Sequence, residues 1–256
     1  MADALLSLAN VTRRFGGLTA VSGVSFDVAP GCIKGIIGPN GAGKTTIFNL
    51  ISSVIPPSAG TISLLGRSLF GKKPHIVAFL GISRTFQTAQ IFPNMTILEN
   101  VMAGRHCRTK TGLLRAAFKT PFARAEERRA AEEAREWLAF AGVIGHYDSL
   151  PGDLPFVIQR KTEIARALAT EPKLILLDEP AAGLNIRETE DMGDLIRKIR
   201  QAGITVLVIE HDMSLVMNIC DEICVLNHGA KIAEGAPRDI RNNPDVIAAY
   251  LGKEKT

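Results

Sequence analysis

The 256-residue sequence has no long apolar run, few aromatic residues and only four cysteines. No stretch approaches the ~18 consecutive apolar residues of a membrane-spanning helix. The first ten residues also lack the basic start and long apolar run of a secretory signal peptide. We therefore expect a cytosolic location, which leaves surface contact with a membrane protein open. Cys32, Cys107, Cys220 and Cys224 lack the paired spacing of a zinc site, which favours reduced, structural thiols.

A strong net charge is missing as well, since 30 Lys and Arg stand against 26 Asp and Glu. Basic residues gather in Arg105–Lys119 and Arg124–Arg135, but the second stretch is interleaved with glutamates. Arg129 and Glu133 are four residues apart, the spacing of ion pairs on a solvated helix face. We therefore expect no nucleic-acid surface there. With 46% hydrophobic residues, the chain is long enough to bury a core without disulfides or a metal.

The sequence does contain a regular alternation of apolar runs and helical patterns. Alternating runs at Leu5–Ala9 and Val24–Val28 predict antiparallel strands, and another short strand is predicted at Thr61–Leu65. Buried strands are predicted at 33–37, 82–86, 174–177 and 204–209, and helices at 44–52, 74–80, 96–103, 123–141, 159–170 and around 192–199. This order predicts an α/β fold with a parallel sheet covered on both faces and a helical insertion of roughly 80 residues.

A glycine-rich segment between the first buried strand and the first helix matches the pattern G-x-x-x-x-G-K-[ST]. Its glycines let the backbone wrap a phosphate chain, and the helix N-terminus adds partial positive charge. Lys44 is expected to reach the β- and γ-phosphates and Thr45 to bind Mg²⁺. The residues expected to hold ATP are Gly38, Pro39, Asn40, Gly41, Ala42, Gly43, Lys44, Thr45 and Thr46.

Polar side chains at the carboxyl ends of other strands complete the expected site. Ligands of open parallel sheets bind just beyond these ends. Asp178, after the apolar run 174–177, would bind Mg²⁺, and Glu179 would activate the attacking water as general base. His211 closes another apolar strand and would contact the γ-phosphate. Gln87, expected at the end of the strand 82–86, would contact Mg²⁺ or the attacking water.

In this order, these motifs resemble the ATP-binding cassette (ABC) family over essentially the whole chain. The resemblance implies a P-loop NTPase (RecA-like) core, an antiparallel β subdomain and an inserted helical subdomain. The whole chain would be a single ABC domain, with its core at 1–87 and 166–256 and its helical subdomain at about 88–165. The family also implies a head-to-tail dimer with two ATP molecules at the interface. Phe15 matches the aromatic residue that stacks on adenine, although it could instead pack against its neighbours.

More locally, the sequence is similar to ATP-binding subunits of branched-chain amino-acid importers. The matching segments are Arg14–Leu18, Arg84–Gln87, Glu179–Asn185 and Asn242–Gly252. Asn185 stands where most cassettes have Asp, and the resemblance puts it at the dimer interface. It also implies transmembrane permease subunits as partners, docked near Gln87 and Ala89–Asn94. A periplasmic binding protein would act indirectly, and the chain would lie at the cytoplasmic face of the inner membrane.

The signature motif departs from the family pattern. The family usually has Leu-Ser-Gly-Gly-Gln, which approaches the γ-phosphate bound to the other subunit. Here the run after Leu154 is Pro155, Phe156, Val157, Ile158 and Gln159. The serine hydroxyl is absent, and Val157 puts a branched Cβ where the backbone should approach phosphate. We therefore predict slow ATP turnover with binding intact; compensation by a backbone shift is the alternative.

The leading hypothesis is a transport ATPase for branched-chain or related amino acids. Lipopolysaccharide-export ATPases are similar single cassettes, so another cargo stays open. Soluble ABC proteins that act on nucleic acid or ribosomes usually carry two cassettes or long coiled coils, and neither is found here. The sequence names neither the cargo nor the partner cassette, which is a second copy or a different chain.

Overall fold

The computed structural model describes residues 4–87, 90–105 and 121–251, and the chain divides into two compact units. The core unit comprises Met1–Arg84 and Lys173–Thr256, and the helical unit comprises Thr85–Pro172. The helical unit begins three residues before and ends seven residues after the expected 88–165, because the whole of helix α6 (Phe156–Leu168) belongs to it. Ala89, Cys107, Gly252 and residues 106–119 of the basic stretch lie outside the described residues.

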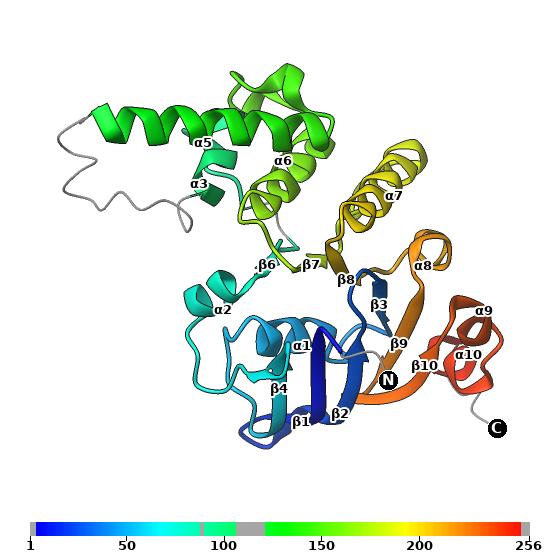
Figure 1. Ribbon diagram of the computed structural model, residues 1–256. Coiled ribbons are helices and arrows are strands. Elements are labelled where there is room, and N and C mark those ends of the chain that lie inside the picture. Colours follow the sequence, from blue (N-terminus) through cyan, green and yellow to red (C-terminus); the bar gives the residue numbers. More distant parts are fainter. Residues whose placement is uncertain (1–3, 88–89, 106–120, 252–256) are drawn as a thin grey trace. The chain divides into compact units, whose positions relative to one another are not determined.

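The larger sheet of the core unit is mostly parallel, as predicted. Its strands are β3 (Ile33–Ile37), β6 (Ile82–Arg84), β7 (Leu174–Asp178), β8 (Thr205–Ile209), β9 (Glu222–Asn227) and β10 (Ala230–Gly235), in the order β10-β9-β3-β8-β7-β6. Every residue of β3, β7 and β8 is buried, as expected for strands covered on both faces. Only β10 pairs antiparallel, at one edge. The carboxyl ends of β3, β7 and β8 therefore meet at the same edge of the sheet (Figure 1).

A second, antiparallel sheet accompanies it in the core unit. It contains β1 (Leu6–Phe15), β2 (Leu18–Val28), β4 (Ala59–Leu64) and β5 (Arg67–Ser68) in the order β2-β1-β4-β5. The first two strands are longer than Leu5–Ala9 and Val24–Val28. Their register shifts between Leu8 and Arg14, and such irregularities break the alternation that reveals a strand in a sequence.

Helices cover both faces of the parallel sheet. They are α1 (Lys44–Ile51), α2 (Pro74–Leu80), α7 (Ile186–Gln201), α8 (Met213–Ile219), α9 (Pro237–Arg241) and α10 (Pro244–Leu251). On one face, α1 and the antiparallel sheet share a single hydrophobic core with alternate residues of the parallel strands. On the other face, Gly35 of β3 lies against Val216 of α8 and Cys220 at its C-cap. The apolar stripe predicted for α7 is buried: Met192, Leu195, Ile196 and Ile199.

The helical unit consists of α3 (Ile97–Arg105), α5 (Pro121–Phe140) and α6, each in contact with the other two (Figure 1). The capping box predicted at Thr96 and Glu99 is present, with reciprocal hydrogen bonds of 2.7 and 3.2 Å. Buried Arg105 ties the three helices together through Glu133 of α5 and Glu171 after α6, at 2.5 and 2.6 Å.

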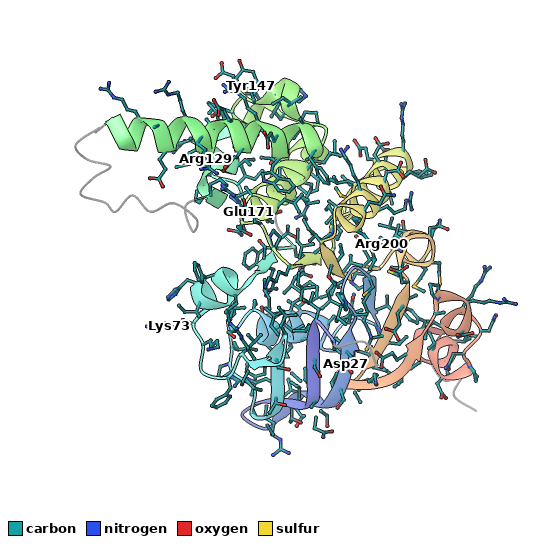
Figure 2. The ribbon with its side chains drawn as sticks, in the orientation of Figure 1. Asp27, Lys73, Arg129, Tyr147, Glu171 and Arg200 are labelled. Carbon is teal, nitrogen blue, oxygen red and sulfur yellow. The ribbon has the colours of Figure 1, made fainter. Side chains whose placement is uncertain are left out.

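The long helix α5 presents a charged face, as its sequence predicted. Arg129, labelled in Figure 2, pairs with Glu133 one turn later at 2.9 Å. None of the described helices combines the length and the apolar character that a bilayer crossing requires.

The three described cysteines are free thiols in the core unit, as predicted. Burial raises the pKa of Cys220 and of Cys224 to about 12. Burial also raises the pKa of Cys32. These groups stay protonated at neutral pH, which suits structural packing rather than metal binding or nucleophilic chemistry.

Candidate functional site

The glycine-rich segment leaves β3 in a conformation that only glycine adopts easily. Gly38, Gly41 and Gly43 have φ values of +149°, +77° and +99°. A Cβ on Gly38 would lie 2.1 Å from the carbonyl oxygen of Leu226, and one on Gly43 would lie 2.6 Å from that of Ala20. The loop therefore packs tightly against β9 of the parallel sheet and β2 of the antiparallel sheet. At Gly41 an added Cβ would meet nothing within 4 Å, so the loop is open there.

The N-terminus of α1 faces this loop without any side chain capping it. Gly43 is the N-cap and has no side chain with which to cap the helix, and the first turn has no acidic residue. The N–H of Ile47 donates to the Gly43 carbonyl at 3.0 Å and closes the first turn. The preceding N–H groups, of Lys44, Thr45 and Thr46, are the type left without partners inside a helix. Together with the helix dipole they form a site for an anion.

The side chain of Lys44, the first residue of α1, turns back into the glycine-rich loop. Its Nζ donates to the carbonyls of Gly38 at 2.8 Å and Pro39 at 3.0 Å, and its side chain is buried. Burial lowers the pKa of Lys44, while the negative charges of Glu179 and Asp178 act in the opposite direction. The same loop is closed by an Ala42 N–H that donates to Pro39 at 3.2 Å. The predicted lysine and both predicted carboxylates are thus close enough to affect one another's charge.

Asp178 ends β7 and is only 2% exposed. Its Oδ2 accepts a hydrogen bond from Arg84 of β6 at 3.0 Å. Arg84 also donates to Asn49 of α1 at 2.7 Å and to Ser52 at 3.2 Å. Arg84 therefore fixes this carboxylate relative to α1. No local pattern indicates this role, because the partners of Arg84 lie far from it along the chain.

Glu179 and His211 are brought together from the ends of β7 and β8. His211 Nε2 lies 2.7 Å from Glu179 Oε1. Glu179 has a φ of +49°, a sparsely populated region for a non-glycine residue, and its N–H donates to the Ile209 carbonyl at 2.9 Å. The predicted placement of both residues at the carboxyl edge of the sheet is correct, and their direct contact is a finding of the structure.

The predicted Mg²⁺ ligands are oxygen donors of the type that this ion prefers. Within the described residues, no three His, Cys, Asp or Glu side chains group closely enough to hold a metal ion. Mg²⁺ commonly relies on one or two carboxylates, with phosphate and water oxygens supplying the rest. Asp178 and the exposed Thr45 are residues of the required type in the same unit, so the chemistry fits.

Phe15 ends β1 beside the hairpin turn at Gly16 and is 44% exposed. The Arg13 guanidinium lies over its ring, 4.6 Å from the centroid. An exposed aromatic ring at a hairpin is compatible with stacking on a base, and it is not packed in the core.

Gln87 and the signature residues belong to the helical unit and are described within it. Gln87 does not end a strand as predicted: β6 stops at Arg84, and Gln87 lies in a bend. The backbone between them bonds to α6 instead, because Glu163 accepts the Phe86 N–H at 3.1 Å and Arg160 donates to the Phe86 carbonyl at 2.8 Å. Arg160 also donates to the Gln87 carbonyl.

The signature residues form the start of α6. Pro155 is its N-cap, with no side-chain cap, and Phe156 begins the helix three residues earlier than predicted. Val157 and Ile158 are half-buried in the first turn, and Gln159 donates to the carbonyls of Pro151 and Leu154, both at 3.0 Å. Position 157 is helical, a conformation open to any residue. Glycine is therefore not required here for backbone reasons.

Asn185 also has a local role within its own unit. It is the N-cap of α7: its side chain accepts the Glu188 N–H at 3.0 Å, and Glu188 accepts the Asn185 N–H at 2.9 Å. This reciprocal pair is a capping box.

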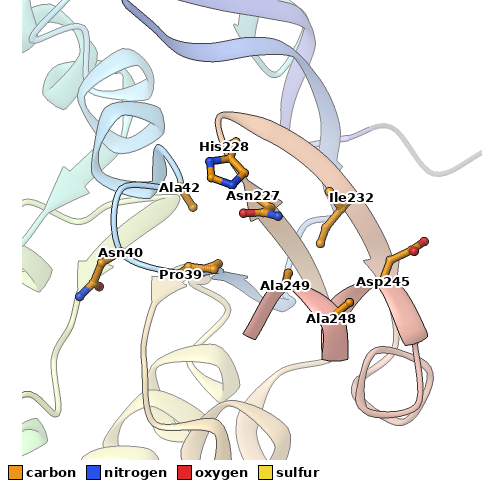
Figure 3. Close-up of a pocket in the computed structure, with 9 residues that line it drawn as sticks. All are labelled: Pro39, Asn40, Ala42, Asn227, His228, Ile232, Asp245, Ala248 and Ala249. Carbon is orange, nitrogen blue, oxygen red and sulfur yellow. The ribbon is translucent and has the colours of Figure 1, made fainter. Parts of the chain in front are cut away.

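The C-terminal helix α10 lies beside the glycine-rich loop. A cavity of about 760 Å³ separates them, and Figure 3 shows Ala249 beside Pro39. Burial raises the pKa of Tyr250, while a hydrogen bond with the Gly38 backbone acts against that rise. The cavity is lined by Pro39, Asn40, Ala42, Asn227, His228, Ile232, Asp245, Ala248 and Ala249.

Comparisons with known proteins agree with this geometry. Residues 21–182 match the ABC transporter family, and residues 230–256 match the family of branched-chain amino acid ATP-binding cassette transporters. The chain is 46% identical to the high-affinity branched-chain amino acid transport ATP-binding protein BraF of Pseudomonas aeruginosa, over 99% of this chain and 100% of that protein. It is 44% identical to LivG of Escherichia coli, a protein with the same description, with the same coverage.

A solved structure gives the same result. The crystal structure of the ADP conformation of an ATP-binding cassette of an ABC transporter superposes with a TM-score of 0.85 at 34% identity. It covers 98% of this chain and 99% of that one. The fold class expected from the sequence, a P-loop NTPase core with an antiparallel sheet and a helical part, is therefore confirmed. The chain belongs to the ATP-binding cassette family of ABC transporters.

Proposed function

We propose that this chain is the ATP-binding and ATP-hydrolysing subunit of an ABC importer for branched-chain or related amino acids. The observation that carries the proposal is the contact between Glu179 and His211 at 2.7 Å, in the same unit as the uncapped N-terminus of α1. The cargo class is supported by the relatives, which are branched-chain amino acid transport ATP-binding proteins at 44–46% identity over their full length.

Each residue has a role that its position supports. The phosphates of ATP would bind to N–H groups of the glycine-rich loop and of the first turn of α1. The Lys44 ammonium would neutralise charge that develops on the γ-phosphate. Glu179 would orient and deprotonate the attacking water, and His211 would contact the γ-phosphate while holding Glu179 in place. Phe15 would stack on the adenine.

Mg²⁺ would be held by Thr45 and Asp178. For Gln87 the family resemblance implies a contact with Mg²⁺ or with the attacking water. When bound, Mg²⁺ would neutralise negative charge between the β- and γ-phosphates. The 3.0 Å bond from Arg84 would keep Asp178 in a fixed orientation for this purpose.

Other subunits complete the proposed machine. A second cassette, identical or different, would place its signature residues, Pro155–Gln159 in this chain, against the γ-phosphate across a dimer interface that includes Asn185. Transmembrane permease subunits would dock near Gln87, with a periplasmic binding protein delivering the amino acid. The chain would then act at the cytoplasmic face of the inner membrane. Because Val157 and Ile158 stand where the importer group normally has Gly-Gln, turnover would be slow while ATP binding stays intact.

The experiment is purification of the tagged chain in mild detergent, followed by identification of its partners by mass spectrometry. We expect two permease subunits of the branched-chain amino-acid type and a second cassette. Recovery of lipopolysaccharide-export permeases would show that the cargo is different, while the transport-ATPase function would stand. Recovery of ribosomes or nucleic acid would overturn the transporter function.

A further inference from the structure

Glu210 is a buried acidic residue that the proposed reaction does not yet use. It follows β8 and immediately precedes His211, and it is 3% exposed. A buried carboxylate is costly unless its oxygens accept hydrogen bonds, so its presence here calls for partners.

Each oxygen of Glu210 bonds to a different loop of the site. Oε1 accepts the N–H of Ala181 at 2.7 Å, and Oε2 accepts the N–H of His211 at 3.1 Å. Ala181 lies in the loop that joins β7 to α7, two residues after Glu179. One side chain therefore joins the loop that carries Glu179 to the loop that carries His211.

Two further contacts link these loops. The N–H of Glu179 donates to the Ile209 carbonyl at 2.9 Å, and His211 Nε2 meets Glu179 Oε1 at 2.7 Å. Glu179 also sits at a φ of +49°, a conformation that persists only where the surroundings hold it. The two bonds of Glu210 supply such support on both sides of the contact.

The chemistry explains why a carboxylate occupies this position. An ionised carboxyl group has two acceptor oxygens, whereas a glutamine side chain offers one acceptor and one donor. Burial raises the pKa of Glu210, but the backbone N–H groups of Ala181, His211 and Asp212 act in the opposite direction. The backbone bonds therefore favour the charged form that can accept from both loops.

We infer that Glu210 is a positioning residue for ATP hydrolysis, which holds Glu179 and His211 in register with each other without touching substrate itself. The inference rests on the proposed function, because it assigns Glu210 a part in the same reaction. It concerns the step after binding, so we expect an effect on kcat and not on ATP affinity.

The test compares Glu210→Ala and Glu210→Gln with the wild type and with Glu190→Gln, a neutralisation of an exposed glutamate on α7. We expect kcat to fall roughly 10- to 100-fold in Glu210→Ala, the scale of effect of small misplacements of catalytic groups. Glu210→Gln keeps the shape of the side chain and one acceptor, so its kcat should lie between those of the wild type and Glu210→Ala. KM, nucleotide affinity and the control variant should stay within about twofold of the wild type.

A second arm separates positioning from simple loss of structure. Single-turnover hydrolysis is measured for Glu210→Ala in a His211→Ala background. If Glu210 acts through His211 and Glu179, its effect should shrink there to less than about threefold, because groups that act as a unit are not additive.

Each outcome decides the matter. An unchanged kcat in both Glu210 variants, beside an active wild type, would overturn the inference. The inference would also be overturned if the rate loss in the double variant equalled the product of the losses in Glu210→Ala and His211→Ala. A parallel loss of ATP affinity and thermal stability in Glu210→Gln would overturn it as well. A wild type that hydrolyses no ATP, alone or with its partners, would instead refute the proposed function.

Discussion

Lys34 shows how a single charged residue can occupy the centre of a sheet. It lies in β3 and is 1% exposed, yet its ammonium donates to the Asp27 carbonyl at 2.6 Å and to Glu222 at 2.8 Å, and also to Glu234. Asp27 belongs to β2, and the two glutamates belong to β9 and β10. One cation therefore joins the two sheets of the core unit.

Replacing this cation should destabilise the protein in a pH-dependent way. Burial alone would lower the pKa of Lys34, but its bonds to Glu222 and Glu234 outweigh burial and raise the pKa. The pKa of Lys34 is therefore higher in the folded protein than in the unfolded chain. Its charge contributes fully to the free energy of unfolding below about pH 10.4, and this contribution is lost as the pH rises through the folded-state pKa. We expect Lys34→Met to cost about 3 kcal/mol at pH 8, because it leaves two carboxylates without their cation.

Urea unfolding of both proteins between pH 8 and 11 measures this difference. The difference in free energy of unfolding between the wild type and Lys34→Met should become smaller towards pH 11. The exposed Lys73→Met serves as control and should match the wild type. A gap that is constant across this range would show that the ammonium charge is not the source of stability.

At the same scale, sequence motifs located Lys44, Asp178, Glu179 and His211 because each follows a strand in a recognisable local pattern. Arg84 and Glu210 were not found. Arg84 acts on Asp178, 94 positions later, and Glu210 acts on Ala181, 29 positions earlier. Such contacts leave no local pattern, since they depend on which strands become neighbours in the sheet.

At the scale of elements, α6 carries the departure from the family signature. Val157 is helical, so its effect would come from side-chain bulk near the phosphate and not from backbone strain. We expect the double change Val157→Gly/Ile158→Gln to raise steady-state ATPase roughly 10-fold, since close backbone donors stabilise developing charge strongly. Nucleotide affinity, measured in parallel, should not change. Equal rates in both proteins would show that the departure is harmless.

The N-terminus of α7 allows a separate test of its capping box. Asn185→Ala should lower the free energy of unfolding by about 1 kcal/mol, because the Glu188 N–H loses its acceptor. Asn185→Asp keeps an acceptor and should match the wild type. The measurement is chemical denaturation of all three proteins, and a loss of equal size in Asn185→Asp would contradict a capping role.

Predicted and observed elements agree best where periodicity is clear. The bounds of β3 and α2 match the prediction residue for residue. The agreement is poorer at β1 and β2, where bulges break the alternation, and at β6, where backbone groups after Arg84 bond to side chains of α6. At β6, a tertiary contact therefore decides where the element ends.

At the scale of the whole molecule, the order of motifs was enough to predict the fold class. It did not predict that β10 pairs antiparallel at the sheet edge, nor that α10 lies beside the glycine-rich loop. Of these two features of the last 30 residues or so, the first is a local hairpin, in which Ala230 pairs with Asn227 across a tight turn. The second is a non-local arrangement that hydrophobic patterns do not encode. That same stretch, residues 230–256, matches the branched-chain amino acid cassette family.

Coupling of ATP hydrolysis to amino-acid import is the function proposed for this chain. It is tested most directly by the ATPase rate of the complex, purified with its membrane partners and binding protein, in proteoliposomes with and without leucine, isoleucine or valine. We predict that these amino acids stimulate hydrolysis and that Glu179→Gln abolishes it while ATP still binds. An ATPase rate that does not change when the amino acids are added, or hydrolysis that persists in Glu179→Gln, would contradict this function.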